Sequence, residues 1–313
     1  MEKLKALAPS FAFALFGLVL IWIGAPVLND WLFRVSLLAL LTVSWNLMAN
    51  AGLISLGHAA FWGAGTYATV LLANAFGASP LLMLPGACIF GAALGLVLAV
   101  ATGRLRGIFF AISTLALSEG LRVVAFMLPG VTGGASGVFV GEAWRASPHA
   151  SLIAAVIVAA VSLALMGLLT LSPIFFASRA MRNNERSAQM LGLDPRRYRM
   201  IVLTIAGAVA AVAGGLSIAY SSYVEPEAAF SMEFTIFPQI AALLGGLYTV
   251  WGSGIGAIAI VTMQDLTRSL LTGRPGVSLA TFGCLLVLCV LYMPRGVAGL
   301  AAMIVRRRGS AAA

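Results

Sequence analysis

Residues 151–176 read SLIAAVIVAAVSLALMGLLTLSPIFF and contain no charged side chain. A helix needs about 20 consecutive apolar residues to cross the hydrocarbon core of a bilayer, so this segment predicts a membrane-spanning helix. The whole chain agrees, since 61% of its 313 residues are hydrophobic and 9% are charged, whereas water-soluble domains are about 45–50% apolar and about 25% charged. The sequence therefore predicts an integral membrane protein, and the lipid bilayer is its first partner.

Further apolar segments of similar length lie on both sides of this one. They are 10–28, 31–49, 54–76, 81–102, 107–128, 200–222, 234–250, 252–271 and 277–292. Together the segments predict an all-α, polytopic transmembrane helix bundle with about ten spans. We expect residues 1–313 to form a single transmembrane domain, because a bundle of spans forms one unit in lipid.

The placement of charge predicts an orientation. With both termini in the cytoplasm, the arginine-rich segments 179–199 and 306–308 fall inside, and the acidic Glu225, Glu227 and Glu233 fall outside. Membrane insertion favours Lys and Arg on the cytoplasmic side. The same pattern explains the high pI of about 10.2, so the sequence predicts no nucleic-acid partner.

The segment 179–199, RAMRNNERSAQMLGLDPRRYR, has an internal order that orientation alone does not require. Asp194 followed by Pro195 is a helix-start signal, with a capping carboxylate and a proline at the first helical position. Gly192 is placed to end a preceding helix in a left-handed conformation. We therefore predict two short cytoplasmic helices joined by a rigid elbow; the simpler alternative is a loop whose arginines only set topology.

The sequence lacks the residue patterns that an ATPase, a metal site or an intramembrane protease would need. Lys3 and Lys5 are its only lysines and neither follows a glycine, so a phosphate-binding loop is excluded and any ATP motor lies on a separate chain. The three cysteines show no metal-ligand spacing, and we expect neither a metal nor a cofactor. Ser136 in GASG resembles an intramembrane protease nucleophile, but the only later histidine is His149 in the same loop. The sequence does not favour an enzyme.

Several blocks together resemble a known family. ERSAQMLGLDPRRYR resembles the coupling loop of ABC importer permeases, with Ser187, Ala188 and Gly192 at its pattern positions. The blocks NAGLISLGHAAFWGAGTYA, STLALSEGLRVV, VTGGASGV, YVEPEAAFS, ALLGGLYTVWGSGIGA and MPRGVAGL follow in family order between residues 50 and 300. The chain resembles the branched-chain amino-acid permease family, in its LivM-type branch. It departs from many ABC importers in having Arg186 where they carry a glutamate, with Glu185 one residue earlier.

This resemblance implies a permease subunit of a binding-protein-dependent ABC importer in the bacterial inner membrane. Its implied partners are two cytoplasmic ATPase subunits, a second related permease and an extracytoplasmic substrate-binding protein. The implied fold has two inverted five-helix halves, and the implied cargo is branched-chain or other apolar amino acids. Urea or a short amide is an alternative cargo. A proton-coupled secondary transporter using Glu119 or Asp265 is an alternative of another class.

Candidate site residues fall into three groups. The ATPase-coupling loop, residues 178–199, contains Glu185, Ser187, Ala188, Gly192, Asp194 and Pro195. The candidate translocation path contains Ser55, His58, Glu119, Arg122 and Thr132, and the candidate docking surface for the binding protein contains Glu225, Glu227 and Glu233. Glu119 and Arg122 share a helix face and are expected to pair toward the bundle interior, as are Asp265 and Arg268. A purely structural role for the path residues is the alternative.

Overall fold

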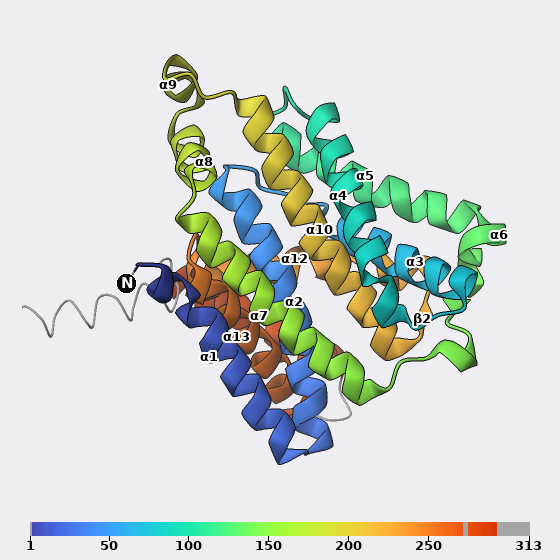
Figure 1. Cartoon of the computed structure of the whole chain (residues 1–313). Coiled ribbons are helices and arrows are strands. Elements are labelled where there is room, and N and C mark those ends of the chain that lie inside the picture. Colours follow the sequence, from blue (N-terminus) through green and yellow to red (C-terminus); the bar gives the residue numbers. More distant parts are fainter. Residues whose placement is uncertain (1, 272–274, 293–313) are drawn as a thin grey trace, which may run out of the picture.

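The computed structural model describes residues 2–271 and 275–292, and Figure 1 shows that part of the chain as a bundle of long helices. The block MPRGVAGL and the arginines at 306–308 lie outside the described residues. The long helices are α1 (Glu2–Ile23), α2 (Pro26–Asn50), α3 (His58–Phe76), α4 (Leu84–Ala101), α5 (Ile108–Met127), α7 (Pro148–Thr170), α10 (Pro195–Ser221), α12 (Glu233–Gly246), α13 (Val250–Leu270) and α14 (Pro275–Tyr292). The shorter helices are η1 (Pro80–Met83), α6 (Pro129–Thr132), η2 (Gly134–Ser136), η3 (Glu142–Trp144), α8 (Pro173–Asn183), α9 (Glu185–Met190) and α11 (Pro226–Ala229).

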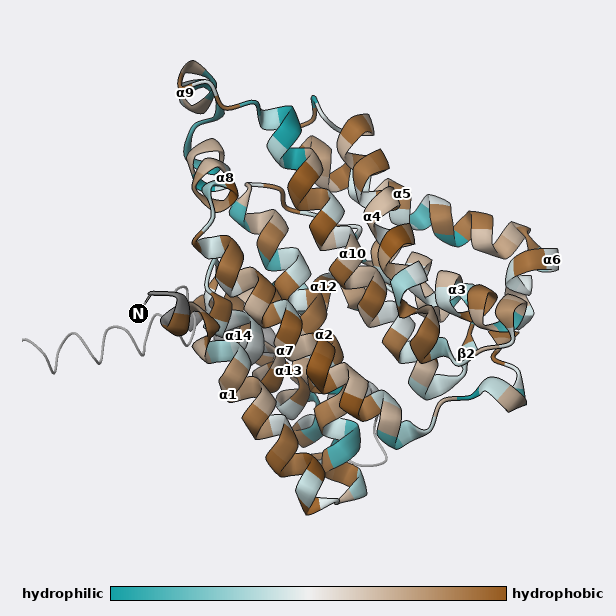
Figure 2. Ribbon diagram, viewed as in Figure 1, coloured by the Kyte–Doolittle hydropathy of each residue, from teal (hydrophilic) through white to brown (hydrophobic). Residues whose placement is uncertain are grey.

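The helices fit a multi-pass membrane protein. Each predicted apolar segment lies mainly in a different long helix, and within the described residues 7 helices are long and apolar enough to cross a membrane. Figure 2 shows mostly hydrophobic residues along the long helices, with hydrophilic residues at the start of α10 beside α9. The all-α polytopic class is therefore confirmed, while the count of about ten spans stays a prediction.

The segment that opened the sequence analysis breaks near its end. Predicted as one span over 151–176, it forms α7 up to Thr170 and a separate helix α8 from Pro173. Ser172 between them has an extended backbone, with φ −91° and ψ 153°. A residue before proline avoids the helical conformation, and proline favours the first position of a new helix. The first part of the apolar run therefore forms the long helix α7, and its last residues form the start of α8, which includes the buried Phe175.

Helix α10 lies at the centre of the bundle, where it packs against α2, α3 and α4. Small residues allow this close packing. A side chain at Gly65 of α3 would place its Cβ 2.0 Å from the carbonyl oxygen of Ala211 on α10, which is closer than two such atoms can approach. The position therefore requires glycine, because the two helix backbones touch there.

At the end of the bundle opposite α9, two short strands join distant parts of the chain. Strand β1 (Val138–Phe139) pairs with β2 (Tyr223–Val224) in antiparallel register, with Val138 opposite Val224. The strands tie the loop after α5 to the loop after α10. Figure 1 places α9 and this pairing at opposite ends of α10.

Candidate functional site

Helix α9 is capped at both ends by local hydrogen bonds. At its start, the side chain of Asn184 accepts from the Ser187 amide at 3.1 Å. At its end, the amides of Leu193 and Gly192 donate to the carbonyl oxygens of Ala188 and Gln189 at 3.1 and 2.9 Å. This is the bond pattern of a helix that ends in a left-handed residue. The φ of Gly192 is +83°, which confirms the predicted left-handed elbow.

The next helix starts as the sequence predicts but continues much further. The Asp194 carboxylate accepts from the Arg196 amide at 2.9 Å, and Pro195 is the first residue of α10. The expectation of a second short helix is wrong, because α10 runs without a break to Ser221. The elbow of residues 191–194 therefore joins α9 directly to the helix at the centre of the bundle.

Glu185 anchors α9 to two other parts of the chain. Its Oε2 lies 3.0 Å from Nε of Arg106 and 3.2 Å from a terminal nitrogen of Arg199. Arg199 also donates to the carbonyl oxygens of Gly103 and Leu105, at 3.2 and 2.8 Å. The side chains of Glu185 and Arg199 are 17% and 10% exposed. We call Glu185, Arg106 and Arg199 the anchor triad, since they join α9, α10 and the loop between α4 and α5.

The outer face of α9 carries exposed apolar side chains. Ala188 is buried at 2% exposure, whereas Met190 and Leu191 are 91% and 80% exposed. Ser187 is also exposed. Figure 1 shows α9 projecting beyond the bundle. The arrangement offers two apolar side chains on a fixed helix.

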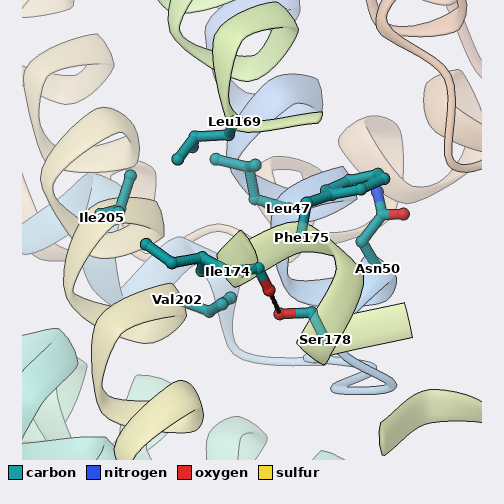
Figure 3. Close-up of a pocket in the computed structure, with 8 residues that line it drawn as sticks. All are labelled: Leu47, Asn50, Leu169, Ile174, Phe175, Ser178, Val202 and Ile205. Carbon is teal, nitrogen blue, oxygen red and sulfur yellow. Dashed lines mark hydrogen bonds between the residues drawn. The ribbon is translucent and has the colours of Figure 1, made fainter. Parts of the chain in front are cut away.

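Helix α8 packs on the bundle and supports the projecting helix α9. Figure 3 shows residues of α8 facing residues of α2, α7 and α10 around a small apolar cavity of about 20 Å³. The Ser178 hydroxyl donates to the Ile174 carbonyl oxygen at 2.8 Å within α8. At the end of α8, the Arg182 guanidinium lies 3.7 Å from the ring centre of Tyr248, a cation–π contact. The support of α9 is thus packed on three helices.

Two candidate path residues lie at an irregular segment inside the bundle. Ser55 and His58 have no exposed surface. The Ser55 hydroxyl accepts from the Gly57 amide at 3.3 Å, and within the described residues neither ring nitrogen of His58 has a hydrogen-bond partner. His58 is therefore not held by a neighbouring carbonyl oxygen in the described part of the chain. Ala59 donates to Thr235 at 3.0 Å, which brings the starts of α3 and α12 together.

The predicted pair on α5 forms, but not where we expected it. Nε of Arg122 lies 2.9 Å from Oε2 of Glu119. Their side chains are 36% and 48% exposed, so the expectation that the pair faces the interior of this bundle is wrong. The face of α5 that carries the pair is directed away from the rest of the chain. A role in the path stays a prediction.

A second ionic cluster escaped the sequence analysis. Both carboxylate oxygens of Asp265 accept from Arg34, at 2.7 and 2.8 Å, and Nε of Arg34 donates to Asp30 at 2.9 Å. The sequence placed Asp265 with Arg268 by spacing alone. No local signal joins Arg34 to a residue so far along the chain, although an arginine within an apolar segment requires a partner.

Thr132 and the external acids lie at the other end of the molecule. The Thr132 hydroxyl is within hydrogen-bond distance of the carbonyl oxygens of Ala125 and Leu128, so it holds the end of α5. Glu225 accepts from the Tyr223 hydroxyl at 3.1 Å. Desolvation and this carboxylate raise the pKa of Tyr223. Glu227 and Glu233 are exposed. In the described part of the chain, no cluster of three or more His, Cys, Asp or Glu could hold a metal ion.

The structure first defines a class: an all-α, multi-pass membrane protein with a fixed helix projecting from one end and ion pairs on its long helices. Sequence comparison then gives the family. The chain belongs to the family of permease components of branched-chain amino acid transport systems, which matches residues 27–290. That family consists of transport permeases and is not a class of enzymes.

Three relatives illustrate the similarity. The chain is 28% identical over 275 residues to the high-affinity branched-chain amino acid transport system permease protein LivM of Escherichia coli K12, covering 79% of this chain and 64% of the relative. It is 25% identical over 255 residues to a probable LivM of Methanocaldococcus jannaschii, covering 74% and 73%. It is 31% identical over 188 residues to the permease protein LivH of Escherichia coli K12, covering 58% of each chain. No solved structure matches.

Proposed function

We propose that this chain is a transmembrane permease subunit of a binding-protein-dependent ABC importer for branched-chain or other apolar amino acids. The observation that carries the proposal is α9, closed by Asn184 and Gly192 and anchored by Glu185. Separate ATPase subunits would bind this helix and a related second permease would complete the path. The relatives are named for branched-chain amino acid transport, which supports this cargo over urea or a short amide.

Mechanical connection supports the coupling role of α9. A flexible loop would absorb the movement of an ATPase, whereas α9 joins α10 through a fixed elbow. The anchor triad adds a second connection, because Arg106 and the carbonyl oxygens bound by Arg199 belong to the loop before α5. A push on α9 would therefore move both α10 and α5. The exposed Met190 and Leu191 are suited to a cleft on the ATPase.

Helix packing supports ten spans in two inverted halves within one domain. In the first half, α3 packs against α4 and α5; in the second, α12 packs against α13 and α14. Each half also packs against the second long helix of the other, since α10 contacts α3 and α4 while α2 contacts α12 and α13. This exchange is what a pseudo-two-fold relation between the halves α1–α5 and α7–α14 would produce.

The orientation of the protein follows from the same proposal. If the chain lies in a bacterial inner membrane with α9 on the cytoplasmic side, the arginines of 179–199 lie inside and both termini are cytoplasmic. The strand pair and the acids Glu225, Glu227 and Glu233 lie outside, where they would receive the substrate-binding protein. The exposed Glu119–Arg122 face of α5 would then face the second permease across the path.

ATP-driven uptake tests the function. In liposomes containing this chain, its partner permease, the ATPases and the binding protein, we expect leucine uptake to require internal ATP and to survive collapse of the proton gradient. Ion pairing supports ATP drive over proton coupling, because Asp265 is paired with Arg34 and Glu119 with Arg122, so neither candidate proton site is an unpaired carboxylate. Uptake that stops when the gradient collapses at constant ATP would contradict the proposal.

A further inference from the structure

A cavity of about 200 Å³ opens between α2, α12 and α13, and Trp62 of α3 contributes to its wall. Its lining combines charge with apolar surface. The polar side chains are Arg34, Glu233, Gln264 and Arg268. Pockets for drug-sized ligands measure about 300–1,000 Å³, so this cavity suits a molecule no larger than a single amino acid.

The charged and apolar residues are separated along the helices. On α2, Arg34 precedes the lining residue Leu41, and on α12, Glu233 precedes Phe237. On α13, which runs antiparallel to α2 because its end meets Arg34 through Asp265, the apolar Val261 precedes the polar residues. The three helices thus place their charged residues at one end of the cavity and their apolar residues at the other. The proposed topology puts the charged end outside.

Arg34 is held in place with hydrogen-bonding capacity to spare. It donates Nε–H to Asp30 and one N–H from each terminal nitrogen to Asp265. A guanidinium has five N–H donors, so one donor on each terminal nitrogen remains. These two N–H groups point away from each other, because Asp265 takes the pair that lies between the terminal nitrogens, so a ligand carboxylate can accept a single charged bond from Arg34. The stacking of Phe33 on Tyr220, with ring centres 4.1 Å apart, fixes the neighbouring turn of α2.

Glu233 supplies the opposite charge. It is exposed at the start of α12, and within the part of the chain that the structure describes its carboxylate makes no ion pair. Its neighbour Phe234 stacks on Trp62 with ring centres 4.1 Å apart, which positions the first turn of the helix. The cavity therefore offers two arginines, one carboxylate and an apolar floor within one small volume.

We propose that this cavity binds a zwitterionic α-amino acid with an aliphatic side chain, on the outer half of this chain. Arg34 takes the carboxylate, Glu233 takes the ammonium group, and the side chain lies against Leu41, Phe237 and Val261. The inference rests on the proposed function, and it adds a binding site within one permease chain where cargo released by the binding protein is held. It also gives Glu233 a role other than docking.

Protection of a single cysteine tests the site. In the assembled transporter with Cys88, Cys284 and Cys289 replaced by serine, Phe237→Cys places a thiol in the apolar floor, and its reaction rate with a maleimide is measured. We expect leucine to slow the reaction. Leucine methyl ester, which lacks the carboxylate, and 4-methylpentanoic acid, which lacks the ammonium group, should each require at least about tenfold higher concentration, the cost of one lost charged contact.

A second substitution assigns the ammonium contact. Glu233→Gln should weaken protection by leucine about tenfold or more and leave protection by 4-methylpentanoic acid unchanged, because that ligand has no ammonium group. Glu142→Gln removes the charge of an exposed acid outside the cavity and outside the docking surface; it is the matched control, and leucine should protect the thiol in this variant as in the parent. Equal weakening for both ligands by Glu233→Gln, equal protection by all three ligands, or no protection by leucine would each overturn the proposal.

The outcome is separable from the proposed function. ATP-driven leucine uptake by the parent transporter is measured in the same liposome preparations. If uptake is intact and leucine gives no protection, the cavity is not a cargo site and the importer function stands. If leucine protects the thiol but ATP drives no uptake, the binding site stands and the proposed function fails.

Discussion

Replacing Gly192 with valine is expected to uncouple ATP hydrolysis from uptake without preventing assembly of the transporter. Gly192 has a φ of +83°, and a Cβ added there would meet no atom within 4 Å. The effect is therefore one of backbone conformation and not of crowding. A left-handed conformation costs an ordinary residue about 1–2 kcal/mol, and valine would relieve it by tilting α9 against α10. Hydrolysis and leucine uptake are measured together in one liposome preparation.

A matched control exists at the same position. Asparagine tolerates the left-handed conformation better than other residues that carry a side chain, so Gly192→Asn should keep most of the coupling. Membrane insertion and recovery of the complex should match the parent for both variants, since Gly192 is exposed and lies outside the long helices. Normal coupling in Gly192→Val would mean that the segment only sets topology through its arginines.

Removing the guanidinium of Arg199 is the second change with a large expected effect. Arg199→Ala deprives Glu185 of one partner and leaves the carbonyl oxygens of Gly103 and Leu105 without this donor. Leaving a buried charge unpaired costs about 3–5 kcal/mol, and Arg199→Ala should cost less, because Glu185 keeps Arg106 as a partner. We expect uptake to fall more than tenfold while the ATPases continue to hydrolyse ATP, because α10 loses its side-chain links to α9 and to the loop before α5, and Glu185 keeps only the more exposed Arg106 of the anchor triad.

Two variants make that result specific. Arg197→Ala removes an exposed arginine two residues earlier on α10 and should behave like the parent. Arg199→Lys keeps the charge but cannot reproduce the planar set of donors, so it should give intermediate uptake. Faster amide hydrogen exchange across 185–193 in Arg199→Ala would locate the defect at α9. Unchanged exchange together with unchanged uptake would show that the anchor triad has no coupling role.

Local chemistry made part of the site predictable. A glycine, an aspartate and a proline within four positions specify a helix end and a helix start, and the structure has both at Gly192 and Asp194. Spacing alone also gave the Glu119–Arg122 pair. Ser172 followed by Pro173 is the same type of helix-start signal, and α8 begins there. It was missed because the apolar run continues through these residues without a break.

Contacts between distant segments could not be predicted in this way. Arg34 meets Asp265, and Arg199 meets the loop between α4 and α5, only after the helices have packed. The exposed position of Glu119 and Arg122 depends on which face of α5 the rest of the chain covers, and periodicity does not determine this in a helix that is apolar on most sides. The triad around Glu185 was missed for the same reason.

Cross-linking from the tip of α9 tests most directly whether this helix is the contact with the ATPase. In a background without the native cysteines, Ser187→Cys puts a thiol on the exposed face of α9, and Glu227→Cys puts one on α11, directly after strand β2 at the end opposite α9. With a short thiol-reactive cross-linker on the assembled transporter, we expect an adduct between position 187 and an ATPase subunit, and none from position 227. An ATPase adduct from position 227, or none from 187 in a transporter that imports leucine, would contradict the account.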